Sequence, residues 1–208
     1  MEIRRCEFTL AGLDFGGVMT TFPAMTSVLE PRVPLLERAH VPDEIAALYD
    51  KLYEDRGVVP NMFKALANVP ELALGITAFL KPLMAEGALR GWYKELIATR
   101  VASLNHCDYC VSAHRLLAEK RGATFGQIAS FDNFENGPFT EKEKTGFRFA
   151  SLLHSSGHAV NESAFDAVRA HFVAQEIVEL TAVAAAFEMF SRINSSLRIP
   201  VTPIPESH

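Results

Sequence analysis

The segment ELIATRVASLNHCDYCVSAH, residues 95–114, contains the most informative pattern in the chain. We expect a break between two helices at Asn105, because asparagine is tolerated both at the left-handed end of one helix and as the N-cap of the next. If the chain folds back there, two antiparallel helices meet at the cysteines. Cys107, Cys110 and His114 follow at spacings of three and four residues, so all three side chains project from one face of the second helix.

From about residue 42 onward the chain contains the residues that typically start and end helices. It lacks segments of alternating apolar and polar residues bounded by Asn-Gly or Asp-Gly turns, which would predict β-strands. Pro42, followed by two acidic residues, predicts a helix that Gly57 ends. A capping box at Thr140 and a candidate N-cap at Asn161 open two further helices. A last long helix is expected over residues 175–197. The sequence therefore predicts an all-α helical bundle.

Two of the expected helices begin with the same dipeptide, which is a weak sign of an internal repeat. Glu95-Leu96 and Glu179-Leu180 each open an apolar helix that is rich in alanine. Two related helical halves and a chance likeness between helix-rich segments are both open interpretations, because the second copy has no cysteine.

Length and composition bound the domain organisation. With 208 residues, of which 49% are hydrophobic, the chain can bury one sizeable core without disulfides. We expect a flexible N-terminal extension over residues 1–25 and a single all-helical domain over residues 26–208. Charged residues interrupt the most apolar stretch, so no membrane span is expected.

The net charge indicates which partners the protein binds, and the number of cysteines indicates the redox state of its compartment. A formal net charge of -5 and the absence of a Lys/Arg cluster exclude a nucleic acid as the expected partner. Three cysteines do not make a secreted disulfide framework, and Cys6 stays unpaired if Cys107 and Cys110 act together. No secretory leader is expected either, so this usage favours a reducing cytoplasm.

The reactive groups of residues 95–114 are spaced for one site. At a rise of about 1.5 Å per residue, Glu95 and His114 lie at similar distances from the turn on their own helices, so they can sit side by side. Glu95 could orient His114, and His114 could accept the proton of Cys110. Cys107 lies nearer to the helix N-terminus, where the dipole lowers a thiol pKa, but we follow the histidine and expect Cys110 to be the thiolate.

These residues resemble the active-site signature of the alkylhydroperoxidase D and carboxymuconolactone decarboxylase superfamily. Glu95, Cys107, Cys110 and His114 match it in order and spacing, and a looser likeness runs from Val59 to the region of Asn194. The chain is especially similar to the peroxidase-related branch, which has a tyrosine before the second cysteine.

The resemblance implies a helical bundle, a homo-oligomer such as a trimer or hexamer, and no metal or organic cofactor. It also implies Cys110 as the peroxide-attacking thiolate, Cys107 as the resolving thiol, and His114 with Glu95 as the proton relay. The chain has Tyr109 where the better-studied alkylhydroperoxidase D proteins have a histidine.

The sequence therefore predicts an antioxidant oxidoreductase that reduces a small hydroperoxide and is restored by a thiol or dithiol reductant. A lyase of the carboxymuconolactone decarboxylase type, a disulfide reductase that passes electrons to another peroxidase, and a redox-sensing oligomer are the alternatives. The thiols could also be buried structural residues, or zinc ligands with His106 and His114, although a single Cys-x-x-Cys is a poor closed zinc set. Two further histidines, His154 and His158, are expected to be solvated.

Overall fold

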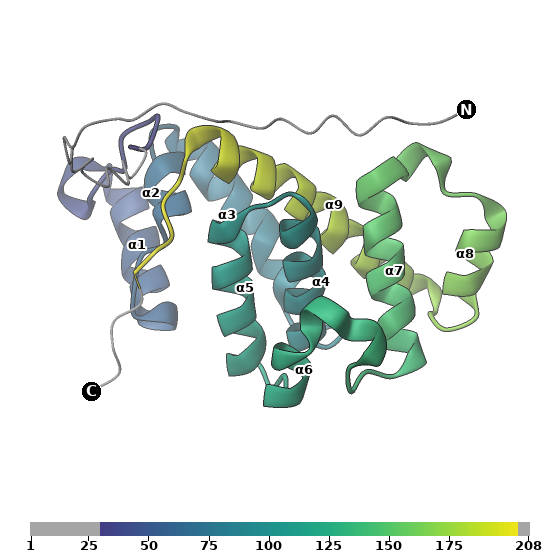
Figure 1. Cartoon of the computed structure of the whole chain (residues 1–208). Helices are drawn as coiled ribbons and strands as arrows, with labels where there is room; N and C mark the ends of the chain where they lie inside the picture. Colours follow the sequence, from purple (N-terminus) through teal and green to yellow (C-terminus); the bar gives the residue numbers. More distant parts are fainter. Residues whose placement is uncertain (1–29, 204–208) are drawn as a thin grey trace, which may run out of the picture.

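The computed structural model describes residues 30–203, and in this range it contains nine α-helices, three short 3-10 helices and no β-strand (Figure 1). The all-α prediction is confirmed. The extension predicted over residues 1–25, and Cys6 within it, lie outside the described residues. The α-helices are α1 (Asp43–Arg56), α2 (Asn61–Leu66), α3 (Pro70–Met84), α4 (Gly91–Leu104), α5 (Asp108–Lys120), α6 (Phe125–Ala129), α7 (Glu141–Ser156), α8 (Glu162–Arg169) and α9 (Ala174–Leu197), and the 3-10 helices are η1 (Arg38–His40), η2 (Phe131–Asn136) and η3 (Gly157–Ala159).

Helix α4 lies in the middle of the bundle, where it packs against α5, α7 and α9 (Figure 1). Its residues are apolar on several faces, and Leu96, Ile97 and Val101 are fully buried. A helix that is apolar on all sides needs neighbours on all sides, which is why α4 occupies the centre. Glu95 is therefore placed inside the protein although it carries a charge.

The turn between α4 and α5 differs in detail from the sequence expectation. Asn105 takes neither the left-handed conformation nor the N-cap role, and its side-chain amide instead donates to the carbonyl of Val101 at 2.9 Å. His106 takes the left-handed conformation with φ 52°, and Cys107 is the N-cap of α5. His106 is exposed, and histidine is one of the residues that tolerate a positive φ. The predicted break at Asn105 and the antiparallel pair are confirmed, since Asn105 is the residue that ends α4, but the left-handed conformation and the N-cap role belong to His106 and Cys107.

The helix boundaries that the sequence indicated agree with the structure. Helix α1 starts after Pro42 and ends at Gly57, which has φ 72° and donates its N–H to the carbonyl of Tyr53. The capping box at Thr140 opens α7, and the side chain of Asn161 accepts the N–H of Ala164 at the start of α8.

Helices α4 and α9 are joined near their N-terminal ends by an ion pair between a buried lysine and a partly exposed glutamate. The Lys94 ammonium, which is 1% exposed, lies 2.8 Å from the Glu179 carboxylate and also donates to the carbonyl of Ala85. The backbone N–H groups of Ala88 and Leu89 donate to the same carboxylate. Burial raises the pKa of Glu179, but the Lys94 charge and the two N–H groups outweigh it and lower the pKa overall. Glu95 and Glu179, which occupy equivalent positions in the possible internal repeat, thus have different partners. A duplication stays an open interpretation.

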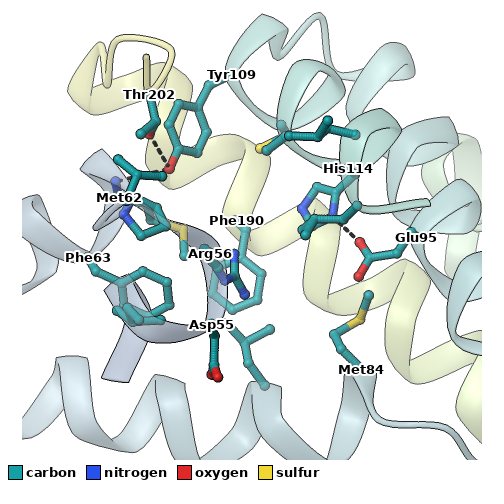
Figure 2. A pocket seen from close by; sticks show the side chains of 18 of the residues that line it. Asp55, Arg56, Met62, Phe63, Met84, Glu95, Tyr109, His114, Phe190 and Thr202 are labelled. Carbon is teal, nitrogen blue, oxygen red and sulfur yellow. Dashed lines mark hydrogen bonds and ion pairs between the residues drawn. The ribbon is translucent and has the colours of Figure 1, made fainter. Parts of the chain in front are cut away.

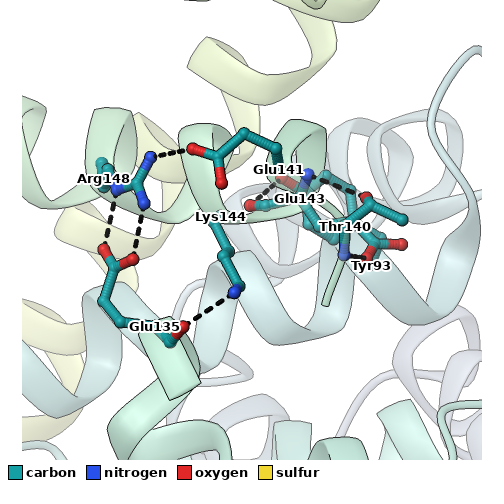
Figure 3. A network of polar contacts seen from close by, with 7 residues as sticks. All are labelled: Tyr93, Glu135, Thr140, Glu141, Glu143, Lys144 and Arg148. Carbon is teal, nitrogen blue, oxygen red and sulfur yellow. Dashed lines mark hydrogen bonds and ion pairs between the residues drawn. The ribbon is translucent and has the colours of Figure 1, made fainter. Parts of the chain in front are cut away.

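Helix α7 reaches α4 by a close approach at a glycine. The hydroxyl of Tyr93 donates to the backbone carbonyl of Glu143 at 2.8 Å, in the first turn of α7 (Figure 3). A Cβ atom on Gly146 would collide with this hydroxyl. On the solvent side of the same helix, Arg148 forms a two-pronged ion pair with Glu135. Glycine at position 146 therefore allows α4 and α7 to pack in direct contact.

Helix α9 ends so that the chain turns back toward α2. Arg198 takes the left-handed conformation with φ 54°, and the N–H of Ile199 closes the turn on the carbonyl of Asn194. The returning segment, residues 199–203, is attached to α2 by the side chain of Asn61, which donates to the carbonyl of Pro200 at 3.1 Å. This segment becomes one wall of the candidate site.

Among residues 30–203, no single helix is both long and apolar enough to cross a membrane. Helices α8 and α9, which meet at 120°, satisfy the criteria of length and composition only when taken together.

We predict that Gly146→Ala lowers the free energy of unfolding by about 1–3 kcal/mol, because the new methyl group overlaps the Tyr93 hydroxyl. The same substitution should cost less in a Tyr93→Phe background, where the hydroxyl is absent. Urea denaturation of the single and double variants measures both values. Gly75→Ala is the matched control, since a Cβ there meets nothing within 4 Å. An equal cost of Gly146→Ala in both backgrounds would show that the overlap is unimportant.

Candidate active site

The predicted site residues lie around one pocket between α1, α3, α5, α9 and the C-terminal segment (Figure 2). The pocket has a volume of about 350 Å³. Glu95, Cys110 and His114 are among its lining residues, whereas Cys107 is not. Most of the remaining wall is apolar and comes from residues distant in sequence, such as Leu52, Met62, Phe63, Met84, Phe187 and Phe190.

Glu95 and His114 form a direct contact across the α4–α5 interface. The Nδ1 atom of His114 lies 2.5 Å from Oε2 of Glu95, whose side chain is 2% exposed (Figure 2). The other carboxylate oxygen lies 3.3 Å from Nε of Arg121. The edge-to-face contact between the imidazole and the Phe187 ring, with centroids 4.4 Å apart, also fixes the ring. Because Nδ1 faces the carboxylate, Nε2 is the nitrogen left for proton transfer.

The two thiols are in contact and are free in this structure. Their sulfur atoms are 3.0 Å apart, which is longer than a disulfide bond of about 2.05 Å and short enough for one thiol to donate to the other. The backbone N–H of Cys110 also points at the Cys107 sulfur, at 3.4 Å, because Cys107 is the N-cap of α5. A small displacement would close the pair into a disulfide.

Electrostatics place the negative charge on Cys107. The hydrogen bond from the Cys110 thiol, the backbone N–H of Cys110, Ser195 and the His114 charge together outweigh burial and lower the pKa of Cys107 to about 6. The hydrogen bond to Cys107 and burial raise the pKa of Cys110. The expectation that Cys110 is the low-pKa thiol is therefore not supported. The hydrogen bond between the two thiols is the largest contribution for both of them, and the backbone N–H at the start of α5 adds to it on Cys107.

Asn194 on α9 is a site residue for which sequence analysis gave no role. Its side-chain amide donates to the Cys110 sulfur at 3.2 Å, and this contact lowers the pKa of Cys110 against the larger opposing effects. The residue is 2% exposed. Its carbonyl oxygen and the hydroxyl of Ser191 are buried without a hydrogen-bond partner among residues 30–203. The signal in the sequence was a polar side chain on the buried face of α9, in helical register with Phe187 and Phe190.

Tyr109, the residue that departs from the family pattern, faces away from the Glu95 and His114 pair. Its hydroxyl accepts the N–H of Met62 at 3.2 Å and lies 3.4 Å from the Thr202 hydroxyl (Figure 2). Burial raises the pKa of Tyr109, so the phenol stays neutral. Tyr109 therefore ties α2 and the C-terminal segment to α5 beside the thiols.

The two histidines that were expected to be solvated have different surroundings. His154 is not simply solvated, since its Nδ1 atom lies 2.6 Å from the Glu188 carboxylate on α9, whereas His158 is exposed as expected. Within residues 30–203, no three His, Cys, Asp or Glu side chains are grouped so that they could hold a metal ion. His106 is exposed in the α4–α5 turn, so the zinc interpretation gains no support here.

The fold and the site together define a class of all-helical proteins with a paired-thiol site at the start of a helix. A model of the carboxymuconolactone decarboxylase family matches residues 70–131, which include all four predicted site residues. The protein YnjA of Escherichia coli is 27% identical over 108 residues, which are 51% of this chain and 59% of YnjA. The match thus spans less than two thirds of that relative.

Solved structures extend this likeness over most of the chain. A peroxidase-related protein from Silicibacter sp. TM1040 has a TM-score of 0.78 and 27% identity, covering 86% of this chain and 95% of its own. A peroxidase-related protein from Ralstonia eutropha, described as an alkylhydroperoxidase AhpD core, has a TM-score of 0.73 and 28% identity, covering 83% and 92%. Together, the family match and these two structures support a place for the chain in the superfamily of alkylhydroperoxidase D-like and carboxymuconolactone decarboxylase-like proteins.

We predict that the reduced protein gains one thiolate with a midpoint near pH 6, because the pKa of Cys107 is lowered to about 6. The ultraviolet absorbance of the thiolate, recorded against pH, measures this midpoint. Cys107→Ser should abolish the step. Cys110→Ala should move it to higher pH, since it removes the thiol that donates to Cys107. A low-pH step that survives Cys107→Ser would place the charge on Cys110 instead.

Proposed function

We propose that the chain reduces organic hydroperoxides with electrons from its own Cys107 and Cys110 thiols, and that an external thiol or dithiol restores the pair. One observation carries this proposal. The two sulfur atoms are 3.0 Å apart, and the Cys110 sulfur borders an apolar pocket that Glu95 and His114 also line. Substrate, nucleophile, resolving thiol and proton donor can therefore meet at one place.

The first step moves a proton away from the thiol that faces the pocket. In the resting pair the charge is on Cys107 and the proton on Cys110. Transfer of this proton across the sulfur contact leaves a thiolate on Cys110, where the Asn194 amide already donates to the sulfur at 3.2 Å. Because the pKa of Cys107 is low, the pair of thiols carries one negative charge at neutral pH. The proton transfer moves this charge from Cys107 to Cys110.

The second step breaks the O–O bond. The Cys110 thiolate attacks one peroxide oxygen, so that an S–O bond forms while the O–O bond breaks and the second oxygen leaves as an alkoxide. The imidazolium of His114 protonates the alkoxide from Nε2, and Glu95 stabilises the charged ring until then. The peroxide is reduced by two electrons, and Cys110 becomes a sulfenic acid.

The third step forms the disulfide. The Cys107 sulfur attacks the Cys110 sulfur, the hydroxyl group leaves, and the Cys107 proton goes with it to give water. Exchange with an external dithiol then returns both thiols to the reduced form. Within the protein, the two thiols are the groups that change oxidation state, so the proposal invokes no metal or organic cofactor. A homo-oligomer, such as a trimer or hexamer, and a reducing cytoplasm as the site of action belong to the same proposal.

The proposal is tested by steady-state reduction of cumene hydroperoxide with dithiothreitol as the reductant. We predict multiple turnovers by the wild-type protein and a loss of kcat/KM of about 100-fold or more in Glu95→Gln, because the imidazole loses its charged partner. Glu119→Gln is the matched control, since Glu119 is exposed on α5 and does not line the pocket. It should retain wild-type kinetics.

Other outcomes identify the alternatives. A redox-sensing oligomer would consume one equivalent of peroxide and stop, even with the reductant present. A lyase of the carboxymuconolactone decarboxylase type would convert its lactone substrate equally well after both cysteines were replaced by serine. A disulfide reductase would consume peroxide only when a separate peroxidase was added. Any of these results would reject the proposed hydroperoxide reduction.

A further inference from the structure

The mouth of the pocket carries an excess of positive charge although the chain has a formal net charge of -5. Lys51 and Arg56 of α1, Lys81 of α3 and Lys120 of α5 all line it. Asp55 is the acidic side chain beside them, and the Glu95 carboxylate deeper in the pocket is engaged by His114 and Arg121. The charges at the mouth therefore come from three helices that converge on one opening.

The lysines that line the pocket differ from the other lysines of the chain in that their side chains lack a hydrogen-bond acceptor among residues 30–203. The chain has seven lysines, and all lie within the described residues. Lys64, Lys94, Lys142 and Lys144 each donate to an acceptor elsewhere in the structure. The three lysines for which residues 30–203 offer no such acceptor are Lys51, Lys81 and Lys120, and each of them lines the pocket.

Arg56 is half-buried, whereas the three lysines at the mouth are exposed. The Arg56 side chain lines the pocket, and Figure 2 shows it between Met62 and Phe190. Its charge is felt at Tyr109, where it contributes to lowering the pKa against the effect of burial. Tyr109 is the residue directly before Cys110, so a group that contacts Arg56 lies in the same pocket as the reacting sulfur.

We propose that the physiological substrate is a single-chain organic hydroperoxide that carries a carboxylate, such as a fatty-acid hydroperoxide. The apolar chain would lie on the Leu, Met and Phe wall, the peroxide at Cys110, and the carboxylate at Arg56 and the three lysines. This assignment rests on the proposed function and names its substrate class. The product is the corresponding hydroxy acid, since the O–O bond is cleaved with electrons from the two thiols.

The size of the pocket favours one chain over a two-chain lipid. Its volume of about 350 Å³ is near the lower end of the range of about 300–1,000 Å³ found for ligand pockets. A neutral alkyl hydroperoxide would fill the apolar wall but leave the cations at the mouth without a counter-charge. A carboxylate supplies this charge, and ion-assisted hydrogen bonds are stronger than neutral ones.

The test compares a linoleic acid hydroperoxide with its methyl ester, which has the same chain and the same peroxide. We expect the wild-type protein to favour the acid in kcat/KM by roughly tenfold. The preference should fall toward that of the ester in Arg56→Gln and in a Lys51→Gln, Lys81→Gln, Lys120→Gln triple variant. Arg90→Gln replaces an exposed cation that does not line the pocket, and it should keep the preference. Comparing the acid-to-ester ratio between the wild-type protein and each variant cancels differences in solubility between the two substrates.

Calorimetric titration with linoleic acid and methyl linoleate separates this inference from the proposed function. Tighter binding of the acid that is lost in the Arg56→Gln variant supports the ligand class, even if no hydroperoxide is turned over and the proposed function fails. Turnover of cumene hydroperoxide with equal kinetics for acid and ester, and equal binding of the two, would overturn the inference and leave the proposed function intact.

Discussion

The antiparallel packing of α4 against α5 is the constraint on which the site depends. The turn between them is closed by the N–H of Cys107, which donates to the carbonyl of Ala102 at 2.9 Å, with His106 in the left-handed conformation. This turn places Cys107 at the N-cap of α5 and aligns His114 with Glu95, whose side chains meet at 2.5 Å. Because α4 is buried on all sides, the carboxylate has little freedom, and the imidazole takes its orientation from it.

The same turn divides the work between the two thiols. Cys107 receives the backbone N–H of the new helix and the hydrogen bond of its neighbour, so it holds the charge at neutral pH. Cys110 borders the pocket and receives the amide of Asn194. In the proposed cycle Cys107 is therefore the thiol that is ionised in the resting state, and Cys110, which faces the substrate, is the nucleophile after proton transfer. Asn194 links α9 to this division by contacting the pocket-facing sulfur.

Local signals made much of the fold predictable. The capping box at Thr140 and the N-cap at Asn161 act within one turn. The spacing of residues 95–114 brought Glu95, Cys110 and His114 to one pocket, with Cys107 in contact with Cys110. The sequence placed Cys107 nearer to the helix N-terminus but could not weigh this position against His114, because the pKa of each thiol depends on burial and on the hydrogen bond between the two sulfur atoms. Asn194 was missed because it is 84 residues from Cys110, and the roles of Tyr109 and the pocket cations depend on distant segments. Periodicity carries no information about such contacts.

The central claim is that the two thiols act in sequence on a peroxide, with Cys110 reacting first. Intact-mass and free-thiol analysis of the reduced protein, before and after one equivalent of cumene hydroperoxide, tests it most directly. We predict that the wild-type protein loses both thiols and two hydrogens, while Cys107→Ser gains a single oxygen on Cys110. Unreacted thiols in the wild-type protein, or a variant in which Cys107 alone is oxidised as fast as the pair, would contradict the account.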